Sequence, residues 1–559
     1  MKTNYSIIIS CLFGLFLFSC KDMDKMNLNP NGVDPSIADP SMVISTVITK
    51  SGTATLYLGW GDLAGVMQHT QKDGWTGGHN RYDWNNQNWG GYYDNLRNAK
   101  ELLRKAEEKE NEFYAGVAKL FLAYNFGAIT DLWGDAPFWG NAPVSQALRG
   151  KDGIKKPKYD RQRDIYLGIL EYLEEANSLL SKNQNTYTVN TVQDVLYGGN
   201  VAKWRKFANS LALRYYLRIS EKEAGIAKEG IQKILDNPSK YPLILDAADD
   251  AAFGFPGGGN NWPSNTLTDA SETGNWMRLK MCSTLVEKLR ELKDPRIAVW
   301  ANRVEIPLVF DPDNPDRDEV VAGKRYIGLN VEKNYNQNSK SAVNPDGDWF
   351  CYNQDYVGLP PAVSSEYAYQ DNPNKQKGQG TYNPHVSNTN DLYKKPTDPL
   401  LKVRMLSAAE MHFNLAEIAL KGWGGNAEEQ YYAGIKASFD VWGVSSGYNA
   451  YIAQDGVKFN NTLAQIMEQK WIASWTAASE AWFDYRRTGL PAFQPGQAVK
   501  VKALPLRFYY GDNELNYNWD NVTEAIEKGL EKTSYFIEAE GLNSAWSKMW
   551  LLQGTGKPW

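Results

Sequence analysis

The sequence predicts a mainly α-helical protein, in which helical hairpins form a scaffold that a loop-rich portion interrupts. Two observations support this prediction. Apolar residues recur at helical spacing in consecutive pairs of segments, whereas residues 243–276 and 305–400 are rich in Gly, Pro, Asn, Asp and Trp and show little periodicity. Loops of that length are uncommon in compact domains unless they are functional. We therefore expect a single domain over 46–559, with its variable ligand portion at about 241–400.

The first 45 residues have the layout of a targeting segment followed by a tether. After the positive charge of Lys2, the apolar stretch 7–18 is too short to span a bilayer as a helix. The residues up to Cys20 resemble a bacterial lipobox, so we expect 1–19 to be a signal peptide of the lipoprotein type and Cys20 to be lipidated. An ordinary signal peptide with a chance cysteine is the alternative. Residues 20–45, rich in Pro and Asn, are then a flexible tether, and no later apolar run is long enough to span a membrane.

Amphipathic segments predict the helical scaffold over about 46–240 and 400–559. The first helix pair, about 93–126, is close to the 34-residue period of tetratricopeptide hairpins. The residue consensus of that repeat is absent, so the likeness concerns architecture only. Hairpins that each bury one face against their neighbours form a stack with a concave side. The apolar stripes are, in chain order, Leu96, Ala99, Leu103 and Ala106; Phe113, Val117, Leu120, Phe121 and Tyr124; Ile165, Ile169, Tyr172, Leu173 and Ala176; Trp204, Ala208, Leu211, Ala212 and Tyr215; Met405, Ala409, Phe413 and Ala416; Tyr431, Ile435, Phe439 and Trp442; and Leu463, Met467, Trp471, Trp475, Ala478 and Trp482.

Composition and charge exclude one class of function. Lys and Arg total 60 and Asp and Glu total 65, which gives a net charge of −5 over 559 residues. A nucleic-acid-binding protein would instead show a basic patch or stripe, so no nucleic-acid partner is expected. Trp, Tyr and Phe make up 13% of the chain. So many rings in a slightly acidic protein indicate stacking surfaces as well as core.

The motifs for catalysis are incomplete. Residues 443–447 fit G-x-S-x-G, but a nucleophile elbow needs a preceding strand, and a helix is predicted there, so we interpret the motif as a helix stop. The four histidines form no H-E-x-x-H, and the chain has no phosphate-binding G-x-x-x-x-G-K-[ST]. Asp131 and Asp135, and Glu480 and Asp484, have spacings that would allow the two carboxylates of a glycosidase to lie close together. Arg486 and Arg487 beside the second pair favour structural ion pairing, so we predict no catalytic residue and no cofactor.

Metal and disulfide sites are also weakly indicated. The acidic stretch 311–318 resembles a calcium loop, but it places Pro315 at a ligand position and lacks the turn glycine. We predict a solvated acidic loop and no metal site there, while binding of a calcium ion elsewhere stays open. Beyond the targeting segment only Cys282 and Cys351 remain, and whether they pair is open as well.

Clusters of aromatic and polar side chains in the loops form the predicted ligand site. A protein that binds sugars without chemistry needs flat rings for the apolar sugar face, and Asn, Asp or Arg for the hydroxyls. One such cluster lies at 72–95, just before the first hairpin, a second near 260–276 and a third, with Trp349, Tyr352, Asn353 and Tyr356, near 349–356. The predicted ligand-binding residues are Trp75, Arg81, Tyr82, Trp84, Asn86, Trp89, Asn261, Trp262 and Trp276.

Exposure decides whether such rings bind a ligand. Any single tryptophan in these loops can instead fill a gap between helices. Trp471, Trp475 and Trp482 differ from the loop tryptophans because they lie on one helical stripe, which predicts that they belong to the core.

Short motifs spread along the chain indicate one family. They are Tyr124-Asn125-Phe126-Gly127, Trp133-Gly134-Asp135-Ala136-Pro137-Phe138, Trp204-Arg205-Lys206-Phe207, Lys293-Asp294-Pro295-Arg296, Glu410-Met411-His412-Phe413-Asn414 and Trp482-Phe483-Asp484-Tyr485-Arg486-Arg487. Together with the lipobox, their order and spacing resemble the SusD/RagB nutrient-binding outer-membrane lipoproteins of Bacteroidetes, and the resemblance covers nearly the whole chain.

The resemblance implies a SusD-like fold, with a tetratricopeptide-like scaffold and a variable loop-rich portion. It also implies a lipid-anchored protein on the outer surface of the outer membrane, which docks as a lid on a SusC-like TonB-dependent transporter and delivers a nutrient, usually an oligosaccharide. Starch-binding members place aromatic and Asn contacts where the first cluster lies. Some members bind peptides, so a peptide-binding lid is the alternative, and a glycoside hydrolase is less favoured. Which glycan or peptide is bound stays open.

Overall fold

The structure is a computed structural model that describes most of the chain from residue 39 onward. The described residues are 39–73, 75, 77–84, 87–182, 189–257, 275–333, 351–362, 383–496, 499–557 and 559. The signal peptide predicted for 1–19 and the lipidated Cys20 therefore lie outside the described residues. Within the described part, no helix is both long enough and apolar enough to cross a membrane.

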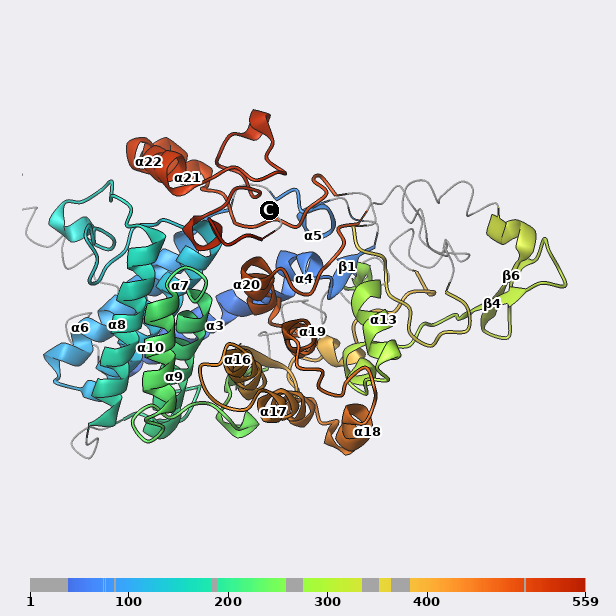
Figure 1. Ribbon diagram of the computed structural model, residues 1–559, viewed down its shortest axis with the longest axis horizontal. Coiled ribbons are helices and arrows are strands. Elements are labelled where there is room, and N and C mark those ends of the chain that lie inside the picture. Colours follow the sequence, from blue (N-terminus) through green and yellow to red (C-terminus); the bar gives the residue numbers. More distant parts are fainter. Residues whose placement is uncertain are drawn as a thin grey trace, which may run out of the picture.

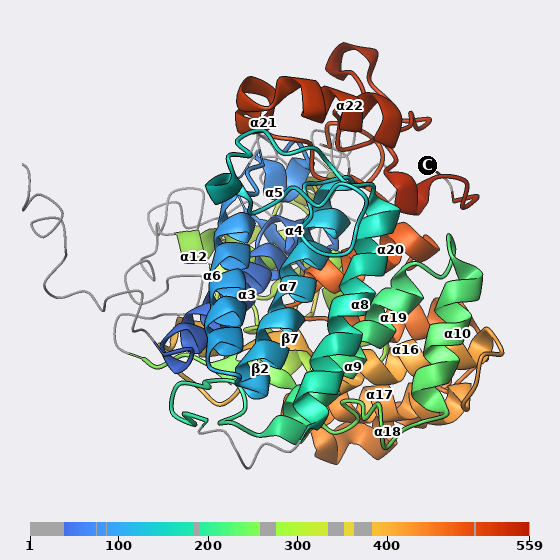
Figure 2. The same cartoon turned by 90° about the vertical axis from the view of Figure 1, so that its left-hand side faces the viewer.

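An antiparallel stack of long helices forms the first half of the scaffold (Figure 2). Neighbours in the sequence pack on one another, α6 on α7, α7 on α8, α8 on α9 and α9 on α10. This arrangement confirms the predicted mainly α-helical class with helical hairpins. The helices are α6 (Gly90–Glu108), α7 (Glu112–Trp133), α8 (Gln162–Ser181), α9 (Val201–Arg218) and α10 (Ala224–Leu235).

The second half of the scaffold comes from the C-terminal part of the chain, and α3 joins the two halves (Figure 1). α3 (Ser41–Trp60) packs against α6 and α7 on one side and against α20 on the other. It begins before residue 46, so the prediction that the tether extends to residue 45 is wrong at its end. The remaining helices of this half are α16 (Ala408–Leu420), α17 (Ala427–Val441), α19 (Leu463–Ala473) and α20 (Ala478–Thr488).

Local sequence signals explain where several of these helices begin and end. The side chains of Asn111 and Ser407 each accept a hydrogen bond from the backbone N–H three residues on, which caps α7 and α16. Gly489 ends α20 with a φ of +77°, a conformation that favours glycine. Gly127 lets α9 approach α7, since a Cβ there would lie 1.8 Å from the hydroxyl of Tyr215.

The loop-rich portion carries short strands and short helices (Figure 1). Its three-stranded sheet has the order β4-β6-β5, with β4 and β6 parallel, while β1 pairs with β3 and β2 with β7, both antiparallel. The strands are β1 (Thr70–Lys72), β2 (Ala251–Gly254), β3 (Leu279–Met281), β4 (Leu308–Asp311), β5 (Asp318–Val321), β6 (Lys324–Gly328) and β7 (Lys402–Leu406). The other helices are α4 (Asp62–Val66), α5 (Gly78–Arg81), α12 (Asn275–Arg278), α13 (Ser283–Glu291), α14 (Ile297–Trp300), α18 (Tyr448–Ile452), α21 (Asp512–Tyr517) and α22 (Trp519–Gly529).

Tryptophans occupy the centre of the scaffold core. Trp471, Trp475 and Trp482 are at most 3% exposed, which confirms that they belong to the core. The prediction of one continuous helical stripe is wrong, because α19 ends at Ala473 and α20 begins at Ala478, so Trp475 lies in the turn between them. The ring of Trp475 stacks on Trp300 at a centroid distance of 5.4 Å and meets Trp60 edge-on at the same distance. Rings from α3, from α14 and from the turn between α19 and α20 therefore meet in one part of the core.

Candidate functional site

Antiparallel pairing of β1 with β3 brings the first predicted cluster to the described end of the second, at α12. Figure 1 labels β1 and α5 in this region. Lys72 pairs with Leu279, and the pairing continues outward because the N–H of Asp73 donates to the carbonyl of Arg278 at 2.7 Å. Trp75 follows β1 and Trp276 precedes β3, so both leave the ribbon at the same end. We call residues 73–84 together with α12 the ribbon end.

A single buried amide fixes the turn that carries Trp75. The side chain of Asn80 accepts from the N–H of Lys72 at 2.9 Å and donates to the carbonyls of Lys72 at 2.7 Å and of Trp75 at 3.4 Å. Gly77 leaves room for the Trp75 ring, since a Cβ there would lie 2.8 Å from its indole nitrogen. The ring is 37% exposed, with the ammonium of Lys72 5.1 Å from its centroid. Trp75 is therefore a pre-positioned, accessible aromatic surface.

Other rings of the first cluster face the scaffold, contrary to the expectation that this stretch displays its aromatics. Tyr82 is fully buried, and Trp84 and Trp89 are each 6% exposed. Trp84 packs edge-on against Phe508 at 4.9 Å and Trp482 at 5.6 Å. Burying so large a ring among other rings is more favourable than leaving it in water. The prediction that Tyr82, Trp84 and Trp89 form exposed platforms is therefore wrong.

The remaining predicted residues are described to different degrees. Arg81 is partly exposed at the end of α5, and its carbonyl accepts from the N–H of Lys500 at 3.2 Å. Asn86, Asn261 and Trp262 lie outside the described residues. Trp276 is described only as a backbone position in α12. Their contacts with a ligand stay predictions.

Unpartnered polar atoms gather around the ribbon end. Buried polar groups are nearly always hydrogen-bonded in folded proteins, and an unpaired one is costly. Among the described residues, the buried atoms without a hydrogen-bond partner include a run of neighbours along the segment that contains α5: Nδ1 of His69 and of His79, Nε of Arg81, Oδ1 of Asp83, Nε1 of Trp84 and Oε1 of Gln87. Unused hydrogen-bonding capacity of this kind is typical of a functional site.

Burial also shapes the charges beneath the ribbon end. Desolvation lowers the pKa of His69 to about 4 and that of His79 well below its usual value, so both imidazoles are neutral at pH 7. Burial lowers the pKa of Lys72 as well, although Asp62 nearby opposes this shift. Burial lowers the pKa of Lys280, within β3, to about 8. The ribbon end therefore rests on neutral imidazoles and partly desolvated ammonium groups.

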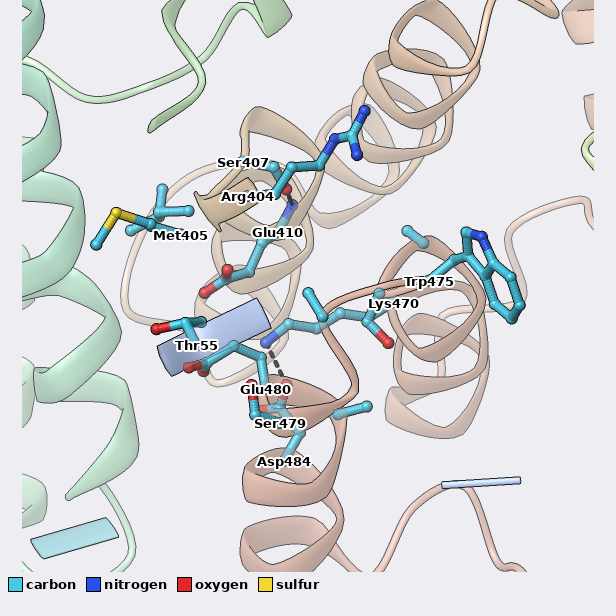
Figure 3. A pocket seen from close by; sticks show the side chains of 15 residues that line it. Thr55, Arg404, Met405, Ser407, Glu410, Lys470, Trp475, Ser479, Glu480 and Asp484 are labelled. Atoms are coloured by element: carbon cyan, nitrogen blue, oxygen red, sulfur yellow. Dashed lines mark hydrogen bonds and ion pairs between the residues drawn. The ribbon is translucent and has the colours of Figure 1, made fainter. Parts of the chain in front are cut away.

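Two of the carboxylates considered for catalysis line a small polar pocket inside the scaffold (Figure 3). Glu480 and Asp484 project from α20, and Lys470 reaches toward them from α19, with its ammonium 2.6 Å from Asp484. The pocket has a volume of about 40 Å³, room for a few waters and far less than a sugar site needs. Burial alone would raise the pKa of Asp484, but Lys470 and Arg487 lower it to about 2.

Ion pairing explains these carboxylates. Glu480 accepts from Arg218 at 2.6 Å, and Asp484 accepts from Arg487 at 3.1 Å. A glycosidase acid needs a raised pKa, whereas that of Asp484 is lowered. The interpretation of this pair as structural, made from the neighbouring arginines, is confirmed in its main point. Arg486 instead donates to the backbone carbonyls of Asp131 and Leu506.

The other motifs singled out in the sequence are structural where they are described. Ser445 of G-x-S-x-G begins a short 3-10 helix after α17, which confirms the helix stop. In the acidic loop, Asp311 pairs with Arg317 at 2.7 Å. No group of three or more metal-ligating side chains forms among the described residues. Cys282 and Cys351 form no disulfide with one another in the structure, and Cys282 is buried.

The third predicted cluster is partly built into a separate apolar core. Trp349 lies outside the described residues. The ring of Tyr352 packs on Phe310 at 5.4 Å, and its hydroxyl donates to Glu332 at 3.1 Å. Asn353 is exposed and Tyr356 half-buried. These contacts give the cluster a packing role in the loop-rich portion.

Sequence reasoning missed the residues that hold the ribbon end in place. Asn80 and Arg278 were not among the predicted site residues, although each fixes a backbone position beside Trp75 or Asp73. A buried Asn that bonds to main-chain groups has no distinguishing sequence pattern, and a three-residue strand gives too short a periodicity to detect.

Solved structures of similar fold come from Bacteroidetes. A SusD homologue from Bacteroides fragilis is 23% identical over 92% of this chain and 99% of its own, with a TM-score of 0.68. A chitin-binding SusD homologue from Flavobacterium johnsoniae is 20% identical over 90% of this chain and 98% of its own, with a TM-score of 0.63. At these identities the likeness concerns the fold. A comparison with curated proteins finds no match.

A family model gives the closer assignment. It matches residues 36–511, which contain the scaffold, the ribbon end and the loop-rich portion. The family is described as SusD-like, starch-binding and associating with the outer membrane. Because this match spans most of the sequence and agrees with the fold, the chain belongs to the SusD-like family.

Proposed function

We propose that the protein captures an oligosaccharide at the ribbon end and passes it, unbroken, to a SusC-like TonB-dependent transporter of the outer membrane. In this proposal a lipid on Cys20 anchors the chain at the cell surface. The observation that supports it most is Trp75, which is 37% exposed and whose backbone carbonyl accepts from Asn80, at the end of the ribbon from which Trp276 also leaves. A flat accessible ring on a fixed turn suits the apolar face of a sugar.

Two further observations support a binding role. Buried polar atoms without a hydrogen-bond partner lie on α5 and on the residues that follow it, in the same segment as Trp75. The family is described as starch-binding, and one relative of the same fold is described as chitin-binding. Oligomers of glucose and of N-acetylglucosamine are therefore the first neutral ligands to examine.

Calorimetry on the full chain purified in detergent tests this proposal. We expect one neutral oligosaccharide of a panel to bind, and Trp75→Ala to weaken that binding about tenfold through loss of ring stacking. Trp519→Ala is the matched control, because Trp519 is also exposed but lies on α22, outside the ribbon end. This variant should bind as the unchanged protein does.

Other outcomes would assign a different role. Binding of oligopeptides with no response to any glycan would make the protein a peptide-binding lid. Release of reducing ends from a polysaccharide, lost in Glu480→Gln, would make it a hydrolase. Co-purification with a transporter but no affinity for either ligand class would leave only a structural role.

A further inference from the structure

A groove away from the ribbon end runs along the outer face of α6. Two hollows, of about 540 Å³ and 380 Å³, border this helix and share Arg97, Leu148 and Gly150 in their linings. Since they share these residues, the hollows adjoin one another. We call them together the α6 groove. Its combined size is that of a site for several sugar units.

The α6 groove has more basic than acidic residues in its lining, although Arg97, Arg104 and Arg149 are already paired with Asp94, Glu101 and Asp152. Its lining contains six basic residues and three acidic ones; the basic ones are Arg97, Lys100, Arg104, Arg149, Lys151 and Lys155. Of the acidic ones, Glu514 is already engaged, since one carboxylate oxygen accepts from Trp89 at 3.1 Å and the other from Tyr159 at 2.6 Å. Lys151 and Lys155 are exposed and have no ion-pair partner among the described residues.

Rings line the same groove. Trp139 and Tyr93 are partly exposed in its walls, and Tyr517 at its edge is 73% exposed. A surface that attracted only charge would not need apolar rings beside the lysines. Rings next to cationic groups fit a ligand with both apolar faces and anionic substituents.

The basic loop of the groove, residues 149–158, is held from both sides. Lys100 on α6 donates to the carbonyl of Leu148 at 2.9 Å while its ammonium lies 4.3 Å from the Trp139 ring centroid. From the other side, Asn518 donates to the carbonyl of Pro157 at 2.9 Å. Because the backbone is fixed, little ordering is needed when an anion binds.

We propose that the α6 groove is a second ligand site of this protein, which binds oligosaccharides that carry carboxylate or sulfate groups. The inference rests on the proposed nutrient-binding function and extends it to a ligand class. Lys151 and Lys155 attract the anionic groups, and the rings of Trp139, Tyr93 and Tyr517 contact the sugar faces. A hollow with ring walls favours a short polymer over a flat lipid surface.

Binding of acidic oligosaccharides to the full chain in detergent tests the α6 groove. The probes are oligogalacturonate, with carboxylates, and a sulfated galactan oligomer, each beside its methyl-esterified or desulfated form. We expect one acidic probe to bind more tightly than its neutral form, and added salt to weaken it. The Lys151→Glu/Lys155→Glu double variant should weaken this binding about tenfold.

Two controls separate this site from the ribbon end and from charge alone. Lys228→Glu makes the same kind of charge change at an exposed position on α10, which packs on α9 and not on α6, and should have little effect. Trp75→Ala should leave the acidic probe bound. Thermal unfolding of each variant confirms that it is folded.

Several results would overturn the inference. These are acidic probes that bind no more tightly than their neutral forms, equal weakening in Lys228→Glu, or loss of acidic binding in Trp75→Ala. Binding to anionic lipid vesicles, lost in the double variant, with no response to the acidic probes would assign the groove to a membrane surface. In each of these cases, neutral oligosaccharides that still bind in a Trp75-dependent manner would leave the proposed function intact.

Discussion

The ribbon end and the network of ion pairs around α20 both bury polar side chains, but they differ in how those side chains are paired. In the network, Arg487 reaches both Glu417 and Asp484, and Arg218 reaches Glu480. At the ribbon end, by contrast, polar atoms of neighbouring residues are buried without partners. The ion pairs of the network fix the scaffold, although Nε and Nη2 of Arg486 also lack a hydrogen-bond partner there. At the ribbon end such unpartnered atoms belong to several consecutive residues, and no ion pair as short as those of the network accompanies them.

This difference also distinguishes two uses of tryptophan. Trp475 and Trp482 lie among other rings in the core, while Trp75 is held by backbone contacts and faces solvent. The residue type is the same in the two regions, so the surroundings of each tryptophan decide whether it packs in the core or stays accessible to a ligand. The comparison therefore predicts that substitutions in the network cost stability, and that those at the ribbon end cost binding.

The largest expected effect comes from breaking the network. Glu417→Ala leaves the buried guanidinium of Arg487 without its main partner, and we expect it to lower the free energy of unfolding by about 3–5 kcal/mol. Denaturant unfolding measures the change. Glu101→Ala is the matched control, because Glu101 pairs with the exposed Arg104 and should cost less than about 1 kcal/mol. Equal losses in both variants would contradict the assigned role of the network.

A smaller effect concerns pH and the histidines under the ribbon end. The folded-state pKa of His69, about 4, lies below the value of 6.5 for an unperturbed histidine, so the unfolded chain binds more protons between these values. The contribution of neutral His69 to the free energy of unfolding is fully present above pH 6.5, and it falls by about 3 kcal/mol as the pH drops to 4. Burial raises the pKa of Asp250 to about 7, which acts in the opposite direction.

Comparison with His69→Gln isolates this histidine. Denaturant unfolding of both proteins at pH 7 and pH 4 should show that the unchanged protein loses about 3 kcal/mol relative to the variant. A constant difference between the two proteins across this range would mean that folding leaves the pKa of His69 unchanged, which would contradict its desolvation.

The smallest effect on stability is expected at the ligand surface itself. Trp75→Ala removes a ring that is already partly in water, so the free energy of unfolding should change by less than about 1 kcal/mol. Trp84 lies nine residues further along the chain and its ring is packed against other rings. Trp84→Ala should therefore lower the free energy of unfolding by about 3 kcal/mol or more. Thermal and denaturant unfolding of the pair would sharpen the comparison, and a large loss in Trp75→Ala would assign its ring to the core.

The scaffold could be predicted from the sequence because long helices repeat their apolar pattern. α8 and α16 each present a stripe that needs no knowledge of distant residues, and the helix stop after α17 follows from its glycines. The burial of Trp471 on α19 and of Trp482 on α20 follows from the same periodicity, whereas Trp475 lies in the turn between these helices.

The site was harder to predict because loops give no periodicity that tells which side a ring faces. Trp75 and Trp84 have similar polar neighbours in the sequence, yet one is exposed and the other meets Phe508 from the far end of the chain. The pairing of β1 with β3 joins segments of three residues each. Strands so short and so distant leave no sequence signal, although the two clusters that they bring together were each identified separately.

Main-chain pairing forms the stem on which the ribbon end sits, and the side chains of Asn80 and Arg278 support it through main-chain carbonyls. Lys72 pairs with Leu279 and Asp73 with Arg278 through backbone groups, which every residue except proline supplies in full. The tips beyond that stem can therefore vary in sequence while their junction stays the same. Replacing both tips with those of a relative that binds a different ligand would then change the ligand specificity, while the helical scaffold stays the same.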